Sequence, residues 1–153
     1  MFESSLTLYR KIFKRFRLMH IVLHWLITHL VIPSLEWSKG FRTIPDDPFW
    51  FRLELLTQHH ETETTRQVAQ LAQPGMVVLD IGAHVGYYSR LCAHLIGPEG
   101  RVIAFEPHPR TFQVLSDNVR NQHNVTPLQI ALSEEEGTAE LYDYLMMSAS
   151  GSL

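Results

Sequence analysis

The two halves of the chain differ in how their hydrophobic positions are spaced. No Asp, Glu, Lys or Arg occurs from Leu18 to Leu35. On a helix that turns about 100° per residue, hydrophobic side chains cover most of the surface of this segment and polar ones form one stripe. The stripe consists of Arg10, Lys14, Arg17, His24 and Thr28, with His20 beside it. The pattern predicts an amphipathic helix over residues 8–32 that Pro33 ends.

The segment 36–60 has no sustained period and predicts a loop with short elements. Its Pro-Asp-Asp-Pro sequence at 45–48 is typical of a turn. The three aromatic residues that follow, 49–51, are expected to pin this arm to a later surface. A helix is then predicted over 61–73, stopped by Pro74 and Gly75.

From Met76 onward, apolar strands alternate with helices. The run 76–81 is almost wholly apolar, which predicts a strand buried on both faces. Further strands are predicted at 101–106, 126–132 and 140–144, and helices at 87–96 and 110–122, the second capped by residues 107–109. This order predicts an α/β fold, a Rossmann-like parallel sheet with right-handed crossovers.

Composition and charge narrow the class of protein. A hydrophobic share of 45% excludes a disordered chain. The lone Cys92, taken as inert core, excludes a disulfide framework, and a net charge of −3 argues against a nucleic-acid partner. His20 with His24, and His59 with His60, lack further ligands in the sequence, so we expect no metal site.

Five basic residues precede the apolar helix, against Glu3 alone: Arg10, Lys11, Lys14, Arg15 and Arg17. The favoured interpretation is that the helix packs on its own domain in a cytoplasmic protein. Two alternatives stay open: peripheral contact of residues 8–32 with an anionic membrane, and a true membrane span.

The residues with candidate chemistry lie where the first predicted strand ends. Asp80 closes the strand, and Gly82 and Gly86 follow, four residues apart. Gly82 would allow close approach of a ligand to the backbone, and Gly86 tight packing of the helix start on the strand. The pattern is not Gly-x-Gly-x-x-Gly, and an acid would oppose a pyrophosphate, which disfavours an NAD-dependent oxidoreductase. A cationic ligand with an amino-acid moiety could instead place its ammonium on Asp80.

Glu106 ends the second predicted strand. An acid there can accept hydrogen bonds from both hydroxyls of a ribose, which predicts an adenosine-containing cofactor. The alternative is that Asp80 and Glu106 are only solvated strand ends.

Three separated blocks resemble the FkbM family of S-adenosylmethionine-dependent methyltransferases: GMVVLDIGAHVGYYS, GPEGRVIAFEPHPRTFQVLSDNV and IALSEEEGTAELY. The resemblance covers about Glu61 to Tyr144. It implies S-adenosyl-L-methionine as cofactor, a class I methyltransferase sheet, and O-methylation of a small-molecule or glycan acceptor. Asp80, Gly82 and Gly86 would line the methionine end and Glu106 would hold the ribose. Ala83, His84, Tyr87 and Tyr88 would form the wall of the turn, and Ala131 would lie near the adenine.

His84 stands where that family usually has Asn, which matters only if the side chain contacts the cofactor. The resemblance identifies no catalytic base and no oligomeric state. Residues 1–60 would form an N-terminal helix and arm, and residues 61–153 a partial methyltransferase domain. Three or four strands are found where such a sheet has about seven, so we expect the front portion of the domain. The alternative is a truncated, non-catalytic remnant that binds the cofactor weakly or not at all.

Overall fold

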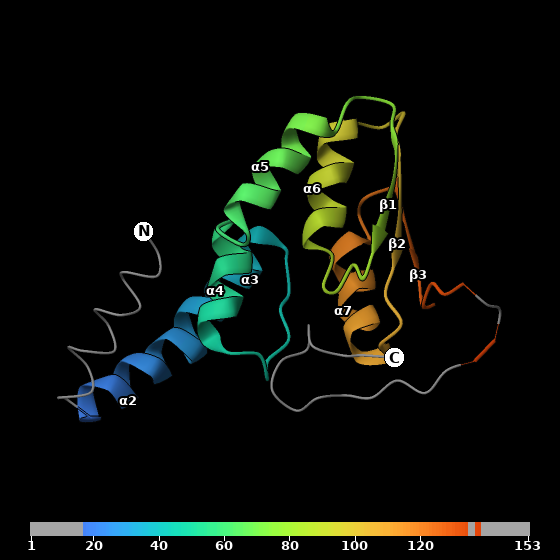
Figure 1. The fold of residues 1–153 in the computed structure, drawn as a ribbon. Coiled ribbons are helices and arrows are strands. Elements are labelled where there is room, and N and C mark those ends of the chain that lie inside the picture. Colours follow the sequence, from blue (N-terminus) through green and yellow to red (C-terminus); the bar gives the residue numbers. More distant parts are fainter. Residues whose placement is uncertain (1–16, 135–136, 139–153) are drawn as a thin grey trace.

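The computed structural model describes residues 17–134 and 137–138 (Figure 1). A long N-terminal helix and two shorter ones precede a unit in which strands and helices alternate. The elements are α2 (Arg17–Leu26), η1 (Ile27–Val31), α3 (Ile32–Lys39), α4 (Phe49–Thr57), α5 (Thr62–Leu71), β1 (Val77–Ile81), α6 (Tyr87–Ile96), β2 (Arg101–Phe105), α7 (Pro109–Val119) and β3 (Val125–Leu128).

The three strands form a parallel sheet in the order β1-β2-β3. Helices α6 and α7 pack on the same face of this sheet, as expected for two successive right-handed crossovers (Figure 1). Val102 and Ala104 of β2 point into this layer and are fully buried. The predicted α/β architecture is therefore confirmed. The predicted strand 140–144 lies outside the described residues.

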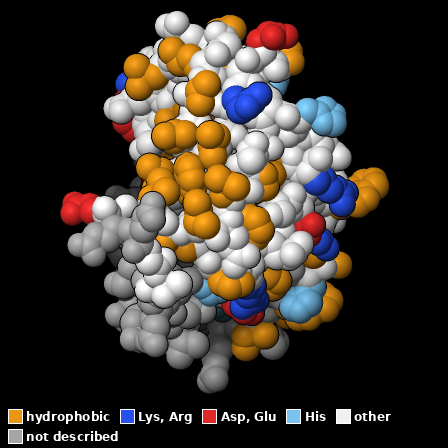
Figure 2. Space-filling model, turned by 90° about the vertical axis from the view of Figure 1, so that its right-hand side faces the viewer, with side chains coloured by type: hydrophobic (Ala, Val, Ile, Leu, Met, Phe, Trp, Pro, Cys, Tyr) orange, Lys and Arg blue, Asp and Glu red, His pale blue; other side chains and the backbone are white. Residues whose placement is uncertain are grey.

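The opposite face of the sheet is exposed, which corrects one prediction. The outward side chains of β1, at Val77, Leu79 and Ile81, are 67%, 56% and 64% exposed. Hydrophobic side chains gather over the strands in the view onto this side of the molecule (Figure 2). The expectation that 76–81 is buried on both faces was wrong for the described part of the chain, because helices cover only one face there.

The third strand is shorter than predicted. β3 pairs with β2 only up to the pair Leu128 and Phe105, beyond which the Glu106 N–H donates to the Leu128 carbonyl at 3.0 Å. The prediction of a strand up to residue 132 was wrong because β2 has already ended at that point. Residues 129–132 continue as exposed, irregular chain.

The N-terminal helix continues past Pro33, where the sequence predicted its end. Proline has no N–H and its ring crowds the carbonyl four residues earlier, so it normally breaks a helix. Here a π-helical turn over η1 widens the helix just before the proline, and the Ile32 N–H donates to the carbonyl of Ile27, five residues back. The helix then runs to Lys39 and ends on the left-handed Gly40.

Residues 36–60 contain a helix, α4, where the sequence predicts a loop with short elements. Its Phe51, Leu55 and Leu56 are buried in a core cluster together with Ile32, Phe41, Ile44 and Val85. The aromatic residues of this arm do pack on a later surface, as predicted, since Val85 belongs to the loop after β1. The division of the chain at residue 60 stays a prediction.

Candidate functional site

The loop between β1 and α6 lies at the carboxyl end of the sheet. The N–H groups of Gly82 and Ala83 both donate to the Phe105 carbonyl at 2.9 Å, which ties the loop to the end of β2. Gly82 has a φ of +76°, and a Cβ placed on it would have no atom within 4 Å. Gly82 therefore faces open space, and a ligand could approach the backbone there.

Gly86 begins α6 and is closely packed. It has a φ of +87°, and an added Cβ would lie 2.7 Å from Cδ1 of Leu115 in α7. The sequence predicts that this glycine lets the start of the helix pack on the strand. The structure corrects this: the closest neighbour is the next helix, so Gly86 allows α6 and α7 to approach each other.

Glu106 is held in place by the loops on either side of it. Its Oε2 accepts the His84 N–H and its Oε1 accepts the His108 N–H, both at 2.9 Å. The residue is only 7% exposed. A carboxylate offers about four lone-pair sites, so about one on each oxygen remains for a ligand. Glu106 is thus an oriented carboxylate rather than a solvated strand end.

Asp80 is partly buried beside α6. Its Oδ2 accepts a hydrogen bond from the Ser89 hydroxyl at 2.5 Å. Burial raises the pKa of the Asp80 carboxyl above its ordinary value, and the hydrogen bonds from Ser89 oppose that rise. The carboxyl also lines a mainly apolar cavity of about 350 Å³ between α5, β1 and α6.

His84 is the residue that departs from the family pattern, and its backbone explains what the position requires. It has a φ of +52°, in the left-handed region where Asn, Asp and His are enriched among non-glycine residues. Its ring lies 5.9 Å from that of Phe51. Burial is the main cause that lowers the pKa of His84 to about 4. The contact from His84 to Glu106 described above runs through the backbone.

The other predicted site residues lie in the loop after β1, on the first turn of α6 and in the segment after β3. Ala83 is buried in a cluster with Ala104 and Leu115. Tyr87 and Tyr88 lie on the first turn of α6, with ring centroids 5.1 Å apart, and the Tyr88 hydroxyl donates to Glu61 at 3.1 Å. Ala131 is exposed in the segment after β3, outside the cluster that holds Ala83.

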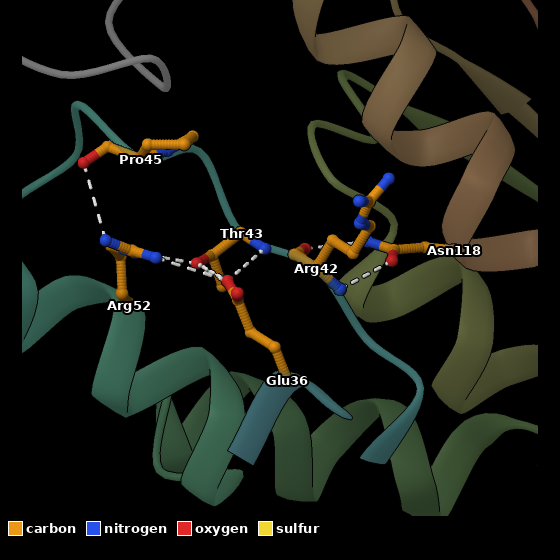
Figure 3. Close-up of polar contacts among 6 residues, drawn as sticks. All are labelled: Glu36, Arg42, Thr43, Pro45, Arg52 and Asn118. Carbon is orange, nitrogen blue, oxygen red and sulfur yellow. Dashed lines mark hydrogen bonds and ion pairs between the residues drawn. The ribbon is translucent and has the colours of Figure 1, made fainter. Parts of the chain in front are cut away.

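Two residues that support the site were missed. Ser89 is the polar member of the buried face of α6, with Cys92, Ala93 and Ile96. A polar residue on this otherwise apolar face, nine residues after Asp80, indicates a buried polar partner and could have been recognised in the sequence. Asn118 joins the loop to the N-terminal arm. Its Nδ2 donates to the carbonyl of Val85. The same Nδ2 donates to the carbonyl of Arg42, and Oδ1 accepts the Arg42 N–H (Figure 3). No local pattern indicates that contact.

Residues 80–152 match the family model described as the methyltransferase FkbM domain. The 31-O-demethyl-FK506 methyltransferase FkbM of Streptomyces tacrolimicus is 41% identical over 73 residues, covering 47% of this chain and 28% of that protein. The hexuronic acid methyltransferase AglP of Haloferax volcanii is 32% identical over 78 residues, covering 50% and 31%.

A protein-L-isoaspartate O-methyltransferase of Triticum aestivum is 29% identical over 83 residues, covering 53% of this chain and 36% of that protein. The chain thus spans about a third of the length of these curated relatives. The matched segment begins at Asp80 and includes the loop after β1, Glu106 and α7. Residues 80–152 therefore match the FkbM methyltransferase family in sequence.

Proposed function

We propose that this chain binds S-adenosyl-L-methionine at the loop after β1 and takes part in methyl transfer to a hydroxyl oxygen. The observation that supports this most directly is the orientation of Glu106. Two backbone amides fix its carboxylate at the end of β2 and leave lone pairs for the two hydroxyls of a ribose. Because the groups are already in place, little ordering would be needed on binding.

The remaining residues suit the other end of the same ligand. The open space at Gly82 would let the cofactor approach the loop closely. The Asp80 carboxyl, steadied by Ser89, would accept the ammonium of the methionine moiety. A nearby cation would favour the charged form of Asp80, which burial alone disfavours.

The bound cofactor would supply a sulfonium methyl group, which passes to the acceptor oxygen as that oxygen loses its proton. The residues described here bind and orient the cofactor, and such alignment can account for a large part of a rate enhancement. We assign no residue of this chain as the base that takes the proton.

Two relatives support a sugar or small-molecule acceptor. One is named for a hexuronic acid, which has hydroxyls and a carboxylate, and the other for a 31-O-demethyl compound, so an oxygen acceptor fits both names. The similarity to a protein-L-isoaspartate methyltransferase makes a peptide carboxylate the competing class of acceptor.

Calorimetric titration of the full chain with S-adenosylhomocysteine tests the cofactor site. We expect binding in the micromolar range for the wild type and a loss of about tenfold or more for Glu106→Ala, which removes both ribose contacts. Glu99→Ala is the matched control because Glu99 is exposed in the turn before β2. Thermal unfolding of each variant without ligand shows whether a loss of binding comes from a loss of fold.

Three outcomes would contradict the proposal. A folded Glu106→Ala variant that binds as tightly as the wild type would remove Glu106 from the site. Displacement of S-adenosylhomocysteine by NAD at comparable concentration would favour a dinucleotide site instead. A folded wild-type chain that gives no heat of binding would support the non-catalytic alternative.

A further inference from the structure

We propose that the exposed side of the N-terminal helix, over α2 and η1, docks on the surface of an anionic lipid bilayer with the helix axis in the membrane plane. Seven apolar side chains form this side, which we call the outer face. They are between 38% and 53% exposed: Met19, Ile21, Val22, Trp25, Leu26, Leu30 and Val31. In Figure 1 this part of the helix extends away from the sheet at the edge of the molecule.

The described residues leave most of the apolar surface of this helix uncovered, whereas the sequence favours a helix that packs on its own domain. Of its 18-residue apolar window within Met19–Lys39, only 6% is buried. Contact with the core is made by the other side of the helix, at Ile27, Ile32 and Leu35. The outer face therefore remains uncovered by the described part of the chain. Apolar surface of this extent normally marks an interaction site.

By length and composition the helix over Met19–Lys39 could cross a membrane, and it is the one such helix among the described residues. Its second half, however, is fixed to the domain. Ile32 is fully buried, and Glu36 Oε1 accepts hydrogen bonds from the Thr43 N–H at 2.9 Å and from Arg52 Nη2 at 3.3 Å (Figure 3). Arg52 also donates through Nε to the Thr43 hydroxyl at 2.7 Å. A span would have to pull these buried polar groups apart.

The described part of the helix that precedes the fixed Ile32 is by itself too short to span a bilayer. From Met19 to Val31 it measures about 20 Å at 1.5 Å per residue, whereas the hydrocarbon core is about 30 Å thick. A helix of this length with one apolar side suits the interface between headgroups and acyl chains. The free segment is shorter than the hydrocarbon core is thick, and its far end is fixed to the domain at Ile32. We therefore place the helix axis in the membrane plane.

Two further features indicate which surface the helix would meet. Trp25 is exposed on the outer face, where it stacks on His29 at a ring distance of 5.0 Å. Trp is one of the two amphipathic aromatic residues that are enriched at bilayer interfaces. The sequence from Arg10 to Arg17 has five Lys or Arg and no acid. Such a cluster next to an amphipathic helix is complementary to anionic lipids.

Co-sedimentation of the full chain with vesicles tests the proposal. We expect binding to mixed phosphatidylcholine–phosphatidylglycerol vesicles, at least about tenfold weaker binding to phosphatidylcholine alone, and weakening by added salt. The double variant Trp25→Glu and Leu30→Glu should lose at least about tenfold in affinity. Leu71→Glu is the matched control, since Leu71 is 72% exposed on α5, away from the outer face.

Each other result has a defined meaning. Equal binding of the double variant and the wild type, with circular dichroism showing both folded, would overturn the assignment of the outer face. Retention of the bound chain in the membrane pellet after alkaline carbonate extraction would overturn the in-plane orientation in favour of a span. A dimer in sedimentation velocity that the double variant abolishes, without vesicle binding by the wild type, would show that a second copy covers the face.

Discussion

The backbone amide of His84 lies 2.9 Å from Oε2 of Glu106, so the loop after β1 and the end of β2 are joined through the predicted ribose acid. The ring of His84 lies 5.9 Å from the ring of Phe51 of α4. The same residue thus connects the candidate cofactor site to the N-terminal arm. We therefore expect a substitution in the arm near Phe51 to alter the position of Glu106, and a substitution at Glu106 to alter the packing of the arm.

The stability of the protein should fall as pH decreases from about 6.5 to about 4. The neutral form of His84 is favoured in the fold, since burial lowers its pKa to about 4 from an ordinary value near 6.5. The unfolded chain binds more protons than the folded chain between these two pH values. His84 therefore contributes up to about 3 kcal/mol to the free energy of unfolding above pH 6.5, and this contribution is lost as the pH falls. Denaturant unfolding at several pH values measures this slope.

His84→Asn should flatten this slope while keeping the fold, because Asn also tolerates a positive φ. His94→Asn, on the exposed side of α6, should leave it unchanged. An unaltered slope in His84→Asn would show that other groups cause the pH dependence.

Gly86→Ala should destabilise the protein more than Gly40→Ala. Both glycines have a positive φ, so both variants lose about 1–2 kcal/mol from the backbone. At Gly86 the new methyl group would also meet Leu115, which is fully buried and cannot move freely. The excess should be roughly 1–3 kcal/mol, measured as the difference in free energy of unfolding. Equal losses at the two positions would contradict the contact between α6 and α7.

Asn118→Ala should cost about 2–4 kcal/mol of the free energy of unfolding, because three hydrogen bonds to backbone groups are lost. Two of them hold Arg42 of the arm and one holds Val85 of the loop. Asn121→Ala, an exposed neighbour, is the control and should change the melting temperature little. A similar effect of both variants would remove the special role of Asn118.

Arg52→Ala should cost about 3 kcal/mol, since it leaves the Glu36 carboxylate without its cation in a largely buried network. The double variant Glu36→Gln and Arg52→Met should recover part of this loss, because no buried charge then remains unpaired. Arg66→Ala removes an exposed ion pair with Glu63 and should leave the melting temperature unchanged. If Arg52→Ala changes the melting temperature as little as Arg66→Ala does, the network of Glu36, Thr43 and Arg52 does not hold α3 to α4.

The sequence predicted the elements of the second half well because their signals are local. The apolar run of β1, the Gly97-Pro98 stop after α6 and the proline at the start of α7 act within a few residues. The exposed face of β1 and the packing of Val85 on α4 depend on the placement of elements far along the chain. No local pattern contains that information.

The residues of the candidate site also fall into those with a local sequence signature and those that depend on tertiary packing. Asp80, Gly82 and Glu106 were recognisable because strand ends and glycine turns have local signatures. The backbone amides of His84 and His108, which hold Glu106, depend on how the loops pack and have no such signature.

The burial of Val85 together with Ile32 and Phe51 bears on how the protein opens. Amide protons within one cooperative unit exchange with solvent together. We expect the amides of the loop after β1 to share their exchange rate with α3 and α4 rather than with the sheet edge at β1. Order at the candidate cofactor loop would then be set by α3 and α4, which end at Thr57, 25 residues before Gly82. Removing these two helices would convert a pre-formed loop into one that must be ordered by its ligand.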